Sequence, residues 1–162
     1  MKHRIRAAGI AVQDDKVLLV KHQQHGETWW VPPGGGFEAQ DGCTQNTVKR
    51  EFFEETGLTD IEVGPLMFVR EFSEDRAGIF HLELFYLVTS WRGEVHLNNL
   101  QGLGGDEHLI QQTSWVNRTE LDDIVLYPDE LCSTLWQQLQ QTSICARHLG
   151  THHDPTPPRR KT

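Results

Sequence analysis

The sequence predicts an α+β protein, built as an α/β/α sandwich in which helices flank a mixed β-sheet. Strand-like runs of aliphatic and aromatic residues dominate the chain, one helical pattern interrupts them near the middle, and a second follows near the end. A chain of 162 residues is large enough for one domain with a buried core. We expect that domain over residues 1–148 and a disordered tail over residues 149–162, which hold three prolines and a basic run.

The amino-terminal part predicts a hairpin. Residues 4–12 are rich in Ala, Ile and Val, which is typical of a strand. Residues 16–21 have four apolar residues between two lysines, which is typical of a buried strand. Asp14-Asp15 between them is a turn signal. After a polar loop, Trp29-Trp30-Val31 leads into the cluster Pro32-Pro33-Gly34-Gly35-Gly36.

Residues 44–56 predict the central helix. Val48 and Phe52 are four residues apart and mark its buried side. Gly57 stands where a helix commonly ends in a left-handed residue.

The second half of the chain predicts more strands and a final helix. Residues 61–72, 79–90 and 113–116 have strand patterns, and residues 98–105 form a glycine-containing loop. Pro128-Asp129-Glu130 is typical of a helix start, because proline tolerates the first turn and acids favour the positive end of the helix dipole. We expect this helix to extend far enough to include both Cys132 and Cys145.

Charge, cysteine content and apolar runs indicate which partners and which location to expect. The formal net charge is −8, from 15 Lys+Arg against 23 Asp+Glu, which argues against binding a nucleic-acid polymer. The three cysteines offer no workable disulfide pair, so we expect a reducing, cytoplasmic location. No apolar run approaches the roughly 20 residues that span a bilayer, and the charged amino terminus lacks a signal-peptide core.

The central helix carries the most informative cluster. Glu51, Glu54 and Glu55 lie at positions i, i+3 and i+4, where like charges repel. A hard divalent cation such as Mg²⁺ would relieve that repulsion, although a solvated acidic surface is the simpler explanation for glutamates alone. The preceding glycines allow the backbone to approach a ligand closely, and Arg50 can pair with Glu54 at i+4. Together these residues indicate metal-assisted phosphate chemistry.

The segment resembles the signature of the Nudix hydrolases, G-x5-E-x7-R-E-U-x-E-E-x-G-U, in which U is bulky and apolar. Residues 50–58, Arg-Glu-Phe-Phe-Glu-Glu-Thr-Gly-Leu, match every defined position of its second half. The resemblance implies the Nudix α/β/α sandwich with a mixed sheet, and the expected strand order fits that fold across most of residues 4–139.

The first half of the signature departs from the family pattern. Counting from Gly36 puts Gly42 at the glutamate position, whereas counting from Gly35 puts Asp41 there, with eight residues before Arg50 instead of seven. We prefer the second register, because Glu38 then matches a further glutamate that many members carry. Whether Asp41 or Gly42 occupies the position stays open at this point.

The resemblance also implies chemistry and site residues. Nudix hydrolases cleave a nucleoside diphosphate linked to another group X, with Mg²⁺ or Mn²⁺ as the cofactor. By analogy Glu51, Glu54 and Glu55 bind the metal, one of them is a candidate base, the Gly34 carbonyl is a further ligand, and Arg50 orients the glutamates. Many members add an acid from a later loop, for which Glu107 is our candidate catalytic residue and Asp106 the second choice.

Candidate contacts to the substrate lie before the signature. Arg6 and His22 could reach a phosphate or a base, although surface charge is the simpler reading for both. Trp29 and Trp30 alternate in a strand, so one should face the core while the other could stack on a base.

We therefore expect a Mg²⁺-dependent enzyme that hydrolyses a small nucleotide, without nucleic-acid or membrane partners. The alternative is a nucleotide-sensing module that has the same fold but lacks turnover; the altered first half of the signature is its support. The substrate, the number of metal ions and whether the chain forms a homodimer stay open.

Overall fold

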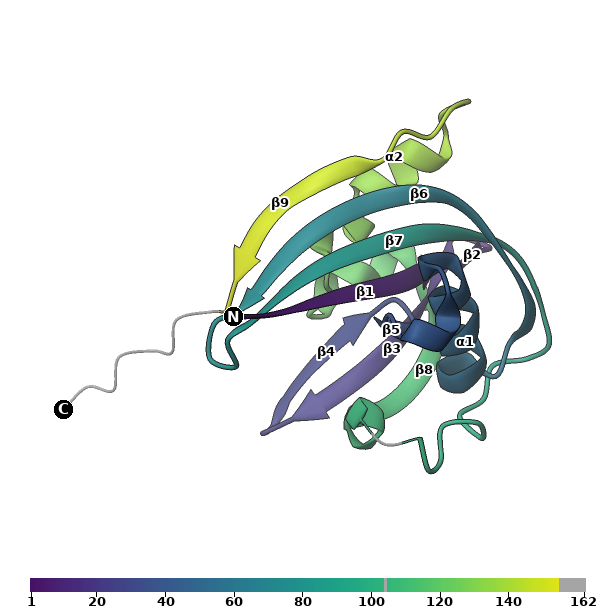
Figure 1. Cartoon of the computed structure of the whole chain (residues 1–162). Helices are drawn as coiled ribbons and strands as arrows, with labels where there is room; N and C mark the ends of the chain where they lie inside the picture. Colours follow the sequence, from purple (N-terminus) through teal and green to yellow (C-terminus); the bar gives the residue numbers. More distant parts are fainter. Residues whose placement is uncertain (104, 155–162) are drawn as a thin grey trace.

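The computed structural model describes residues 1–103 and 105–154, which form two β-sheets with helices packed around them (Figure 1). The strands are β1 (Lys2–Ile10), β2 (Val12–Gln13), β3 (Lys16–Gln24), β4 (Glu27–Val31), β5 (Gly34–Gly36), β6 (Thr59–Glu74), β7 (Ile79–Arg92), β8 (Ile110–Asn117) and β9 (Arg147–His153). The α-helices are α1 (Thr44–Thr56) and α2 (Thr134–Leu139). Short 3₁₀ helices are η1 (Ala39–Asp41), η2 (Gly105–Leu109), η3 (Arg118–Asp123) and η4 (Asp129–Cys132).

The larger sheet is mixed and has the order β5-β1-β7-β6-β9. Strand β1 runs parallel to β7 and antiparallel to β5, while β6 and β7 form a long antiparallel pair. The mixed sheet confirms the predicted α+β class. It also brings the glycine strand β5 alongside the amino-terminal strand β1, which positions the site described below.

The smaller sheet contains β2, β3, β4 and β8, with β3 at its centre. Asp14 and Asp15 have φ values of 50° and 58° and connect β2 to β3, so the predicted turn is confirmed. The hairpin partner of β3 is the two-residue strand β2, however, and the longer β1 belongs to the other sheet.

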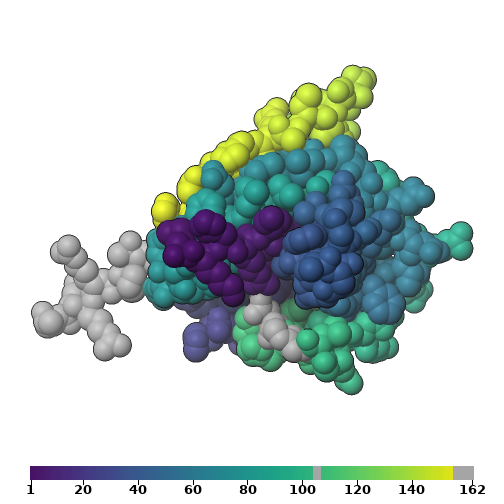
Figure 2. Space-filling view, viewed as in Figure 1, coloured from purple at the N-terminus to yellow at the C-terminus, as the bar shows by residue number. Residues whose placement is uncertain are grey.

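Helix α1 has the predicted bounds and packs through Val48 and Phe52, both fully buried, against Ala7, Tyr86 and Val88 of the larger sheet. Gly57 ends it in the left-handed region at φ 76° and donates its N–H to the Phe53 carbonyl. In Figure 2, α1 and β1 lie side by side on the visible face.

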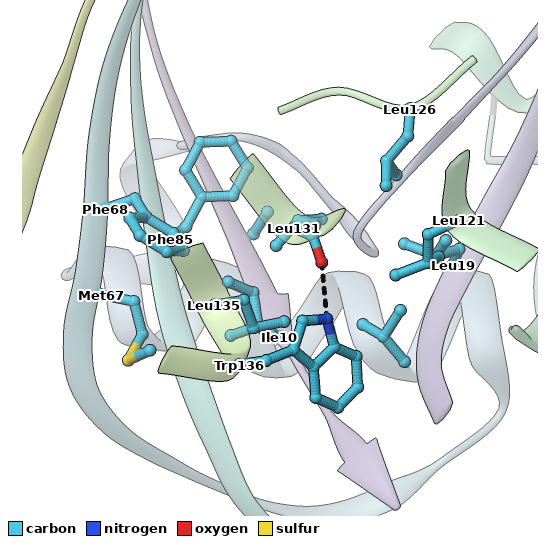
Figure 3. Packing of buried hydrophobic residues seen from close by; sticks show 12 residues of the cluster. Ile10, Leu19, Met67, Phe68, Phe85, Leu121, Leu126, Leu131, Leu135 and Trp136 are labelled. Carbon is cyan, nitrogen blue, oxygen red and sulfur yellow. Dashed lines mark hydrogen bonds between the residues drawn. The ribbon is translucent and has the colours of Figure 1, made fainter. Parts of the chain in front are cut away.

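A second apolar cluster fills the space between the sheets and α2 (Figure 3). Met67 and Phe68 from β6 and Phe85 from β7 pack there with Leu135 and Trp136 of α2. The Trp136 indole donates to the Leu131 carbonyl at 2.9 Å, so its polar atom is satisfied inside the core.

The carboxyl-terminal helix is shorter than predicted. A 3₁₀ turn ends at Cys132, Ser133 breaks the helical path with a φ of −135°, and α2 ends at Leu139. Cys145 is exposed and lies outside the helix, and all three cysteines are free. None of the helices in the described ranges is long and apolar enough to cross a membrane.

The prediction that disorder begins at residue 149 is also wrong. Residues 149–153 belong to β9, which runs parallel to β6 along the edge of the larger sheet (Figure 1). Backbone pairing with β6 orders this polar stretch, and the Thr151 hydroxyl donates to Glu71 at 3.1 Å. Residues 155–162 of the predicted tail lie outside the described residues.

Candidate active site

The glycine strand β5 and helix α1 together bury two of the predicted glutamates. Glu51 and Glu55 are only 8% and 7% exposed, on the side of α1 that faces β5. The Gly34 backbone N–H donates to Glu55 Oε2 at 3.1 Å. Any side chain at Gly35 would clash with the Glu51 carboxylate, since even a Cβ atom there would overlap it. The glycines therefore matter because they let the helix carboxylates approach the strand backbone.

Arg50 holds the cluster together through several partners. Its guanidinium donates to Asp41 at 2.8 and 3.0 Å, to Glu51 at 2.8 Å and to the Gly36 carbonyl at 2.9 Å. The predicted i+4 pair with Glu54 exists, but at 3.5 Å it is the longest of these contacts. Arg50 thus connects the helix to η1 and β5 rather than serving Glu54 alone.

Asp41 is the acid of the altered first half of the signature. It is 7% exposed and accepts hydrogen bonds from Arg50, the Thr47 hydroxyl and the Glu38 backbone N–H. The bond from Arg50 is the main reason that the pKa of Asp41 lies well below its usual value. The neighbouring Gly42 ends η1 at φ 73° and has no side chain to offer, so Asp41 supplies the carboxylate that meets Arg50.

The three helix glutamates carry more negative charge than the arginine offsets. Burial raises the pKa of Glu51, Glu54 and Glu55, and the nearby Glu51 charge raises that of Glu55 further, well above its usual value. Arg50 acts in the opposite direction on Glu51 and Glu54. Buried carboxylates short of positive charge fit a hard divalent cation, because their oxygens are the ligands that Mg²⁺ and Mn²⁺ prefer.

These carboxylates are not arranged as a finished coordination shell. Among the described residues, no group of three or more acidic, His or Cys side chains is placed to hold one ion. Arg50 engages Glu51 through Oε1 and Gly34 engages Glu55 through Oε2, so these contacts use one oxygen of each carboxylate.

Glu107 occupies the loop before β8 that was predicted to supply a further acid. Its two carboxylate oxygens accept hydrogen bonds from the backbone N–H groups of Gly102 and Leu103, at 3.1 and 2.8 Å. These bonds support the loop, and a catalytic role for Glu107 stays a prediction. The side chain of Asp106, the second choice, lies outside the described residues.

The two tryptophans behave as their alternation predicts. Trp30 packs against the cluster between the sheets, which confirms a core position for one of them. Trp29 instead stacks on the buried His22 across the β3–β4 pair, with ring centroids 5.6 Å apart. A substrate contact by Trp29, Trp30 or His22 stays a prediction.

Arg6 lies closer to the glutamates than sequence reasoning indicates. On β1 it pairs in register with Gly36 of β5, next to the glycines that contact Glu51 and Glu55. Its positive charge acts to lower the pKa of both glutamates. Arg6 also lines a small pocket.

That pocket contains residues that sequence reasoning gave little weight. Arg6, Arg70 and Glu83 line it together with Tyr127 and an apolar group made up of Ala8, Val31, Pro32, Leu84 and Phe85. The alternating pattern of residues 79–90 could have indicated Glu83, because this acid lies on the same side of the strand as the buried Phe85. The pairing across strands that brings Arg6 and Arg70 to it is not visible in the sequence.

A model of the NUDIX domain matches residues 3–136, which is most of the chain. The chain belongs to the Nudix hydrolase family. The Nudix signature therefore coincides with the glycine strand, η1 and α1 that build the buried acidic cluster. Membership places the protein among enzymes that act on phosphoric anhydrides.

Solved structures share the Nudix fold at low identity. A MutT protein from Bacillus halodurans has a TM-score of 0.65 and 24% identity, covering 94% of this chain and 91% of its own. A MutT protein from Methanosarcina mazei Go1 has a TM-score of 0.66 and 17% identity, with coverages of 86% and 97%. An ADP-ribose pyrophosphatase from Streptococcus suis has a TM-score of 0.60 and 19% identity, with coverages of 90% and 98%. No curated protein sequence matches the chain.

Proposed function

We propose that this Nudix hydrolase is a Mg²⁺- or Mn²⁺-dependent pyrophosphohydrolase that cleaves a nucleoside diphosphate linked to another group X. The observation that carries the proposal is the pair of buried glutamates, Glu51 and Glu55, packed against a strand of glycines. Burying such charges is costly without a compensating cation. A solved structure named as an ADP-ribose pyrophosphatase shares the fold, and its name supports a nucleotide substrate.

The metal site would consist of Glu51, Glu54, Glu55 and the Gly34 carbonyl. A bound divalent ion would neutralise phosphate oxygens and lower the pKa of a bound water. Arg50 orients Glu51 and Glu54 through contacts of 2.8 and 3.5 Å. Glu54 is the most accessible of the three glutamates and the least firmly held, which suits it to accept the proton of the attacking water.

The remaining features of the proposal concern the substrate and its location. A net charge of −8 suits a small nucleotide held through a metal better than a nucleic-acid polymer. The unpaired cysteines support a cytoplasmic enzyme.

A test compares hydrolysis across a panel of nucleoside triphosphates, nucleotide sugars and dinucleoside polyphosphates, with Mg²⁺, with Mn²⁺ and with chelator. We expect metal-dependent release of a nucleotide product, and a loss of about 10²–10⁴-fold in kcat for Glu54→Gln. Glu94→Gln, which changes an exposed glutamate outside the cluster, should retain full activity.

Two outcomes would reject the enzyme assignment. One is a wild-type protein that cleaves no member of the panel, and the other is full activity in Glu54→Gln. Tight binding of an intact nucleotide without product would instead support the nucleotide-sensing module.

A further inference from the structure

Three charged side chains form a row across neighbouring strands of the larger sheet. In the register of the sheet, Arg6 of β1 lies beside Glu83 of β7, and Glu83 lies beside Arg70 of β6. All three line the small pocket, where the other lining residues are uncharged. Two guanidiniums and one carboxylate leave the row with one net positive charge.

The two arginines hold Glu83 unequally. Arg70 Nη1 lies 2.7 Å from Glu83 Oε2, whereas Arg6 Nε lies 3.8 Å from Glu83 Oε1. The shorter contact is a charge-assisted hydrogen bond, and the longer one is an ion pair beyond hydrogen-bond distance. Glu83 is therefore neutralised mainly by Arg70.

Arg70 is also fixed by its other neighbours. Its guanidinium carbon lies 5.3 Å from the centre of the Phe72 ring and 5.9 Å from that of Tyr127, both within range of cation–π attraction. Its side chain is only 9% exposed, against 25% for Arg6. Arg70 is thus held by Glu83, Phe72 and Tyr127, and Arg6 is the more accessible cation.

Arg6 connects this row to the acidic cluster. Its partner across the β1–β5 pair is Gly36, and the adjacent glycines contact Glu51 and Glu55. The charge of Arg6 acts on Glu51 and Glu55, so it would also act on a phosphate group bound beside those glutamates. An arginine already committed to a buried carboxylate would be a poor ligand for that phosphate, because a second partner competes for the same donors.

We propose that Arg70 and Glu83 are positioning residues that keep Arg6 available for a phosphate of the substrate. Arg70 satisfies Glu83, so that Arg6 contacts it only loosely and can turn to the phosphate. This inference rests on the proposed function, because it assumes a diphosphate beside the helix glutamates. It assigns a part in substrate affinity to a charged row whose three residues, Arg6, Arg70 and Glu83, all lie outside the signature in sequence.

The proposal predicts that Arg70 affects phosphate binding through the charge of Glu83, and Arg6 by direct contact. In Arg70→Met, the unsatisfied Glu83 carboxylate draws Arg6 toward itself and the row becomes neutral. In Arg70→Met/Glu83→Gln, the competing carboxylate is gone and the net positive charge returns. In Glu83→Gln alone, Arg6 is freed while Arg70 remains.

The experiment measures binding of methylenediphosphonate, a diphosphate analogue whose P–C–P linkage cannot be hydrolysed, by titration calorimetry with Mg²⁺ present. We expect Arg70→Met and Arg6→Met each to weaken binding about 10- to 100-fold, the range for one charge-assisted hydrogen bond. The double variant Arg70→Met/Glu83→Gln should bind within about twofold of wild type, and Glu83→Gln at least as tightly as wild type. Arg92→Met is the matched control, because Arg92 forms an exposed ion pair with Asp60 outside the pocket.

The binding stoichiometry separates positioning from structural support, because Glu83→Gln also removes the buried charge that Arg70→Met leaves unpaired. Positioning predicts that Arg70→Met binds more weakly but at full stoichiometry. A reduced fraction of binding-competent protein at wild-type affinity, or a loss of binding that Glu83→Gln does not restore, would overturn the proposal. Equal binding by wild type and Arg70→Met, or no binding by wild type, would also overturn it. Wild-type hydrolysis of nucleotides is measured separately, so a protein that shows the rescue without turnover refutes the proposed function and leaves this inference standing.

Discussion

At the scale of one residue, Asp41 pairs with Arg50 although the first half of the signature departs from the family pattern. The extra residue before α1 is accommodated by η1, whose end places the Asp41 carboxylate 2.8 Å from Arg50 Nε. The Asp41 side chain is only 3% exposed, so its hydrogen bonds are protected from water. The same arginine contacts Glu51, which makes Asp41 a support for the acidic cluster.

We therefore predict that Asp41→Asn lowers the free energy of unfolding by about 1–3 kcal/mol, the usual range for a hydrogen bond to a charged group. Asp60→Asn, which changes an exposed ion pair with Arg92, should change it by at most about 0.5 kcal/mol. Urea unfolding at neutral pH measures both. Equal stabilities for wild type and Asp41→Asn would show that the Arg50–Asp41 pair is not a net stabilising contact.

The pH dependence of this difference has a definite sign. Because the pKa of Asp41 is lowered by folding, its contribution is fully present above the unfolded pKa of about 4 and is lost as pH falls below it. The gap between wild type and Asp41→Asn should narrow when unfolding is measured at pH values below about 4.

Residue roles were predictable where they depend on local spacing. Glu51 and Glu55 were selected from helical spacing, and both lie in the buried cluster. Spacing also predicted Glu54 as the partner of Arg50, but Asp41, nine positions earlier, lies closer to Arg50, at 2.8 Å against 3.5 Å. That contact depends on the conformation of η1, which no periodic pattern encodes.

At the scale of the element, strands and helices with strong local signals were predicted well. Helix α1 has the expected bounds, because its buried stripe and its terminal glycine both act locally. Strand β9 was missed, because its sequence is polar and its order comes from pairing with β6. Strand formation at a sheet edge depends on the neighbouring strand more than on intrinsic propensity.

We predict that a chain ending at Ala146, which lacks β9, is less stable than the full chain. It loses the backbone pairing with β6, the half-buried packing of Leu149 and the 2.9 Å contact between His148 and Glu71. We expect a loss of about 1–3 kcal/mol, or roughly 2–10 °C in Tm for a protein of this size. Thermal unfolding followed by circular dichroism measures the shift.

The control for the strand prediction is His153→Gln in the full chain. His153 and Asp75 form an exposed contact at 3.1 Å, and exposed pairs contribute little. Its Tm should stay within about 2 °C of wild type. An unchanged Tm in the shortened chain would mean that β9 does not contribute to stability in solution.

At the scale of the whole molecule, the fold class was predictable and the three-dimensional pairing was not. Period-two and helical patterns identified most elements. They did not indicate that β1 leaves its hairpin neighbour and joins β5 and β7. That arrangement places Arg6 beside the glycines and assembles the charged row, so the site depends on contacts between elements far apart in sequence.

Metal binding and folding stability should be linked, because both depend on the charge of the buried glutamates. Folding raises the pKa of Glu51 and Glu55 by burial. Their contribution to the stability of the metal-free protein is therefore present below the unfolded pKa of about 4.3, and is lost as pH rises through the raised values. Asp41, with its lowered pKa, stays ionised across this range and adds no slope.

We predict that Mg²⁺ stabilises the protein increasingly as pH rises from about 5 to about 8, because the ion binds the carboxylates only when they are ionised. At 100 times its Kd, Mg²⁺ should add about 2.7 kcal/mol to the free energy of unfolding at the higher pH. Thermal unfolding with Mg²⁺ and with chelator, repeated across this pH range, measures the gain. Glu51→Gln/Glu55→Gln is the control: without metal it should be more stable than wild type at pH 8, because it buries no carboxylate charge, and it should gain little from Mg²⁺. A gain that is equal at both ends of the range, or that survives in the double variant, would place the ion elsewhere than at the glutamates of α1.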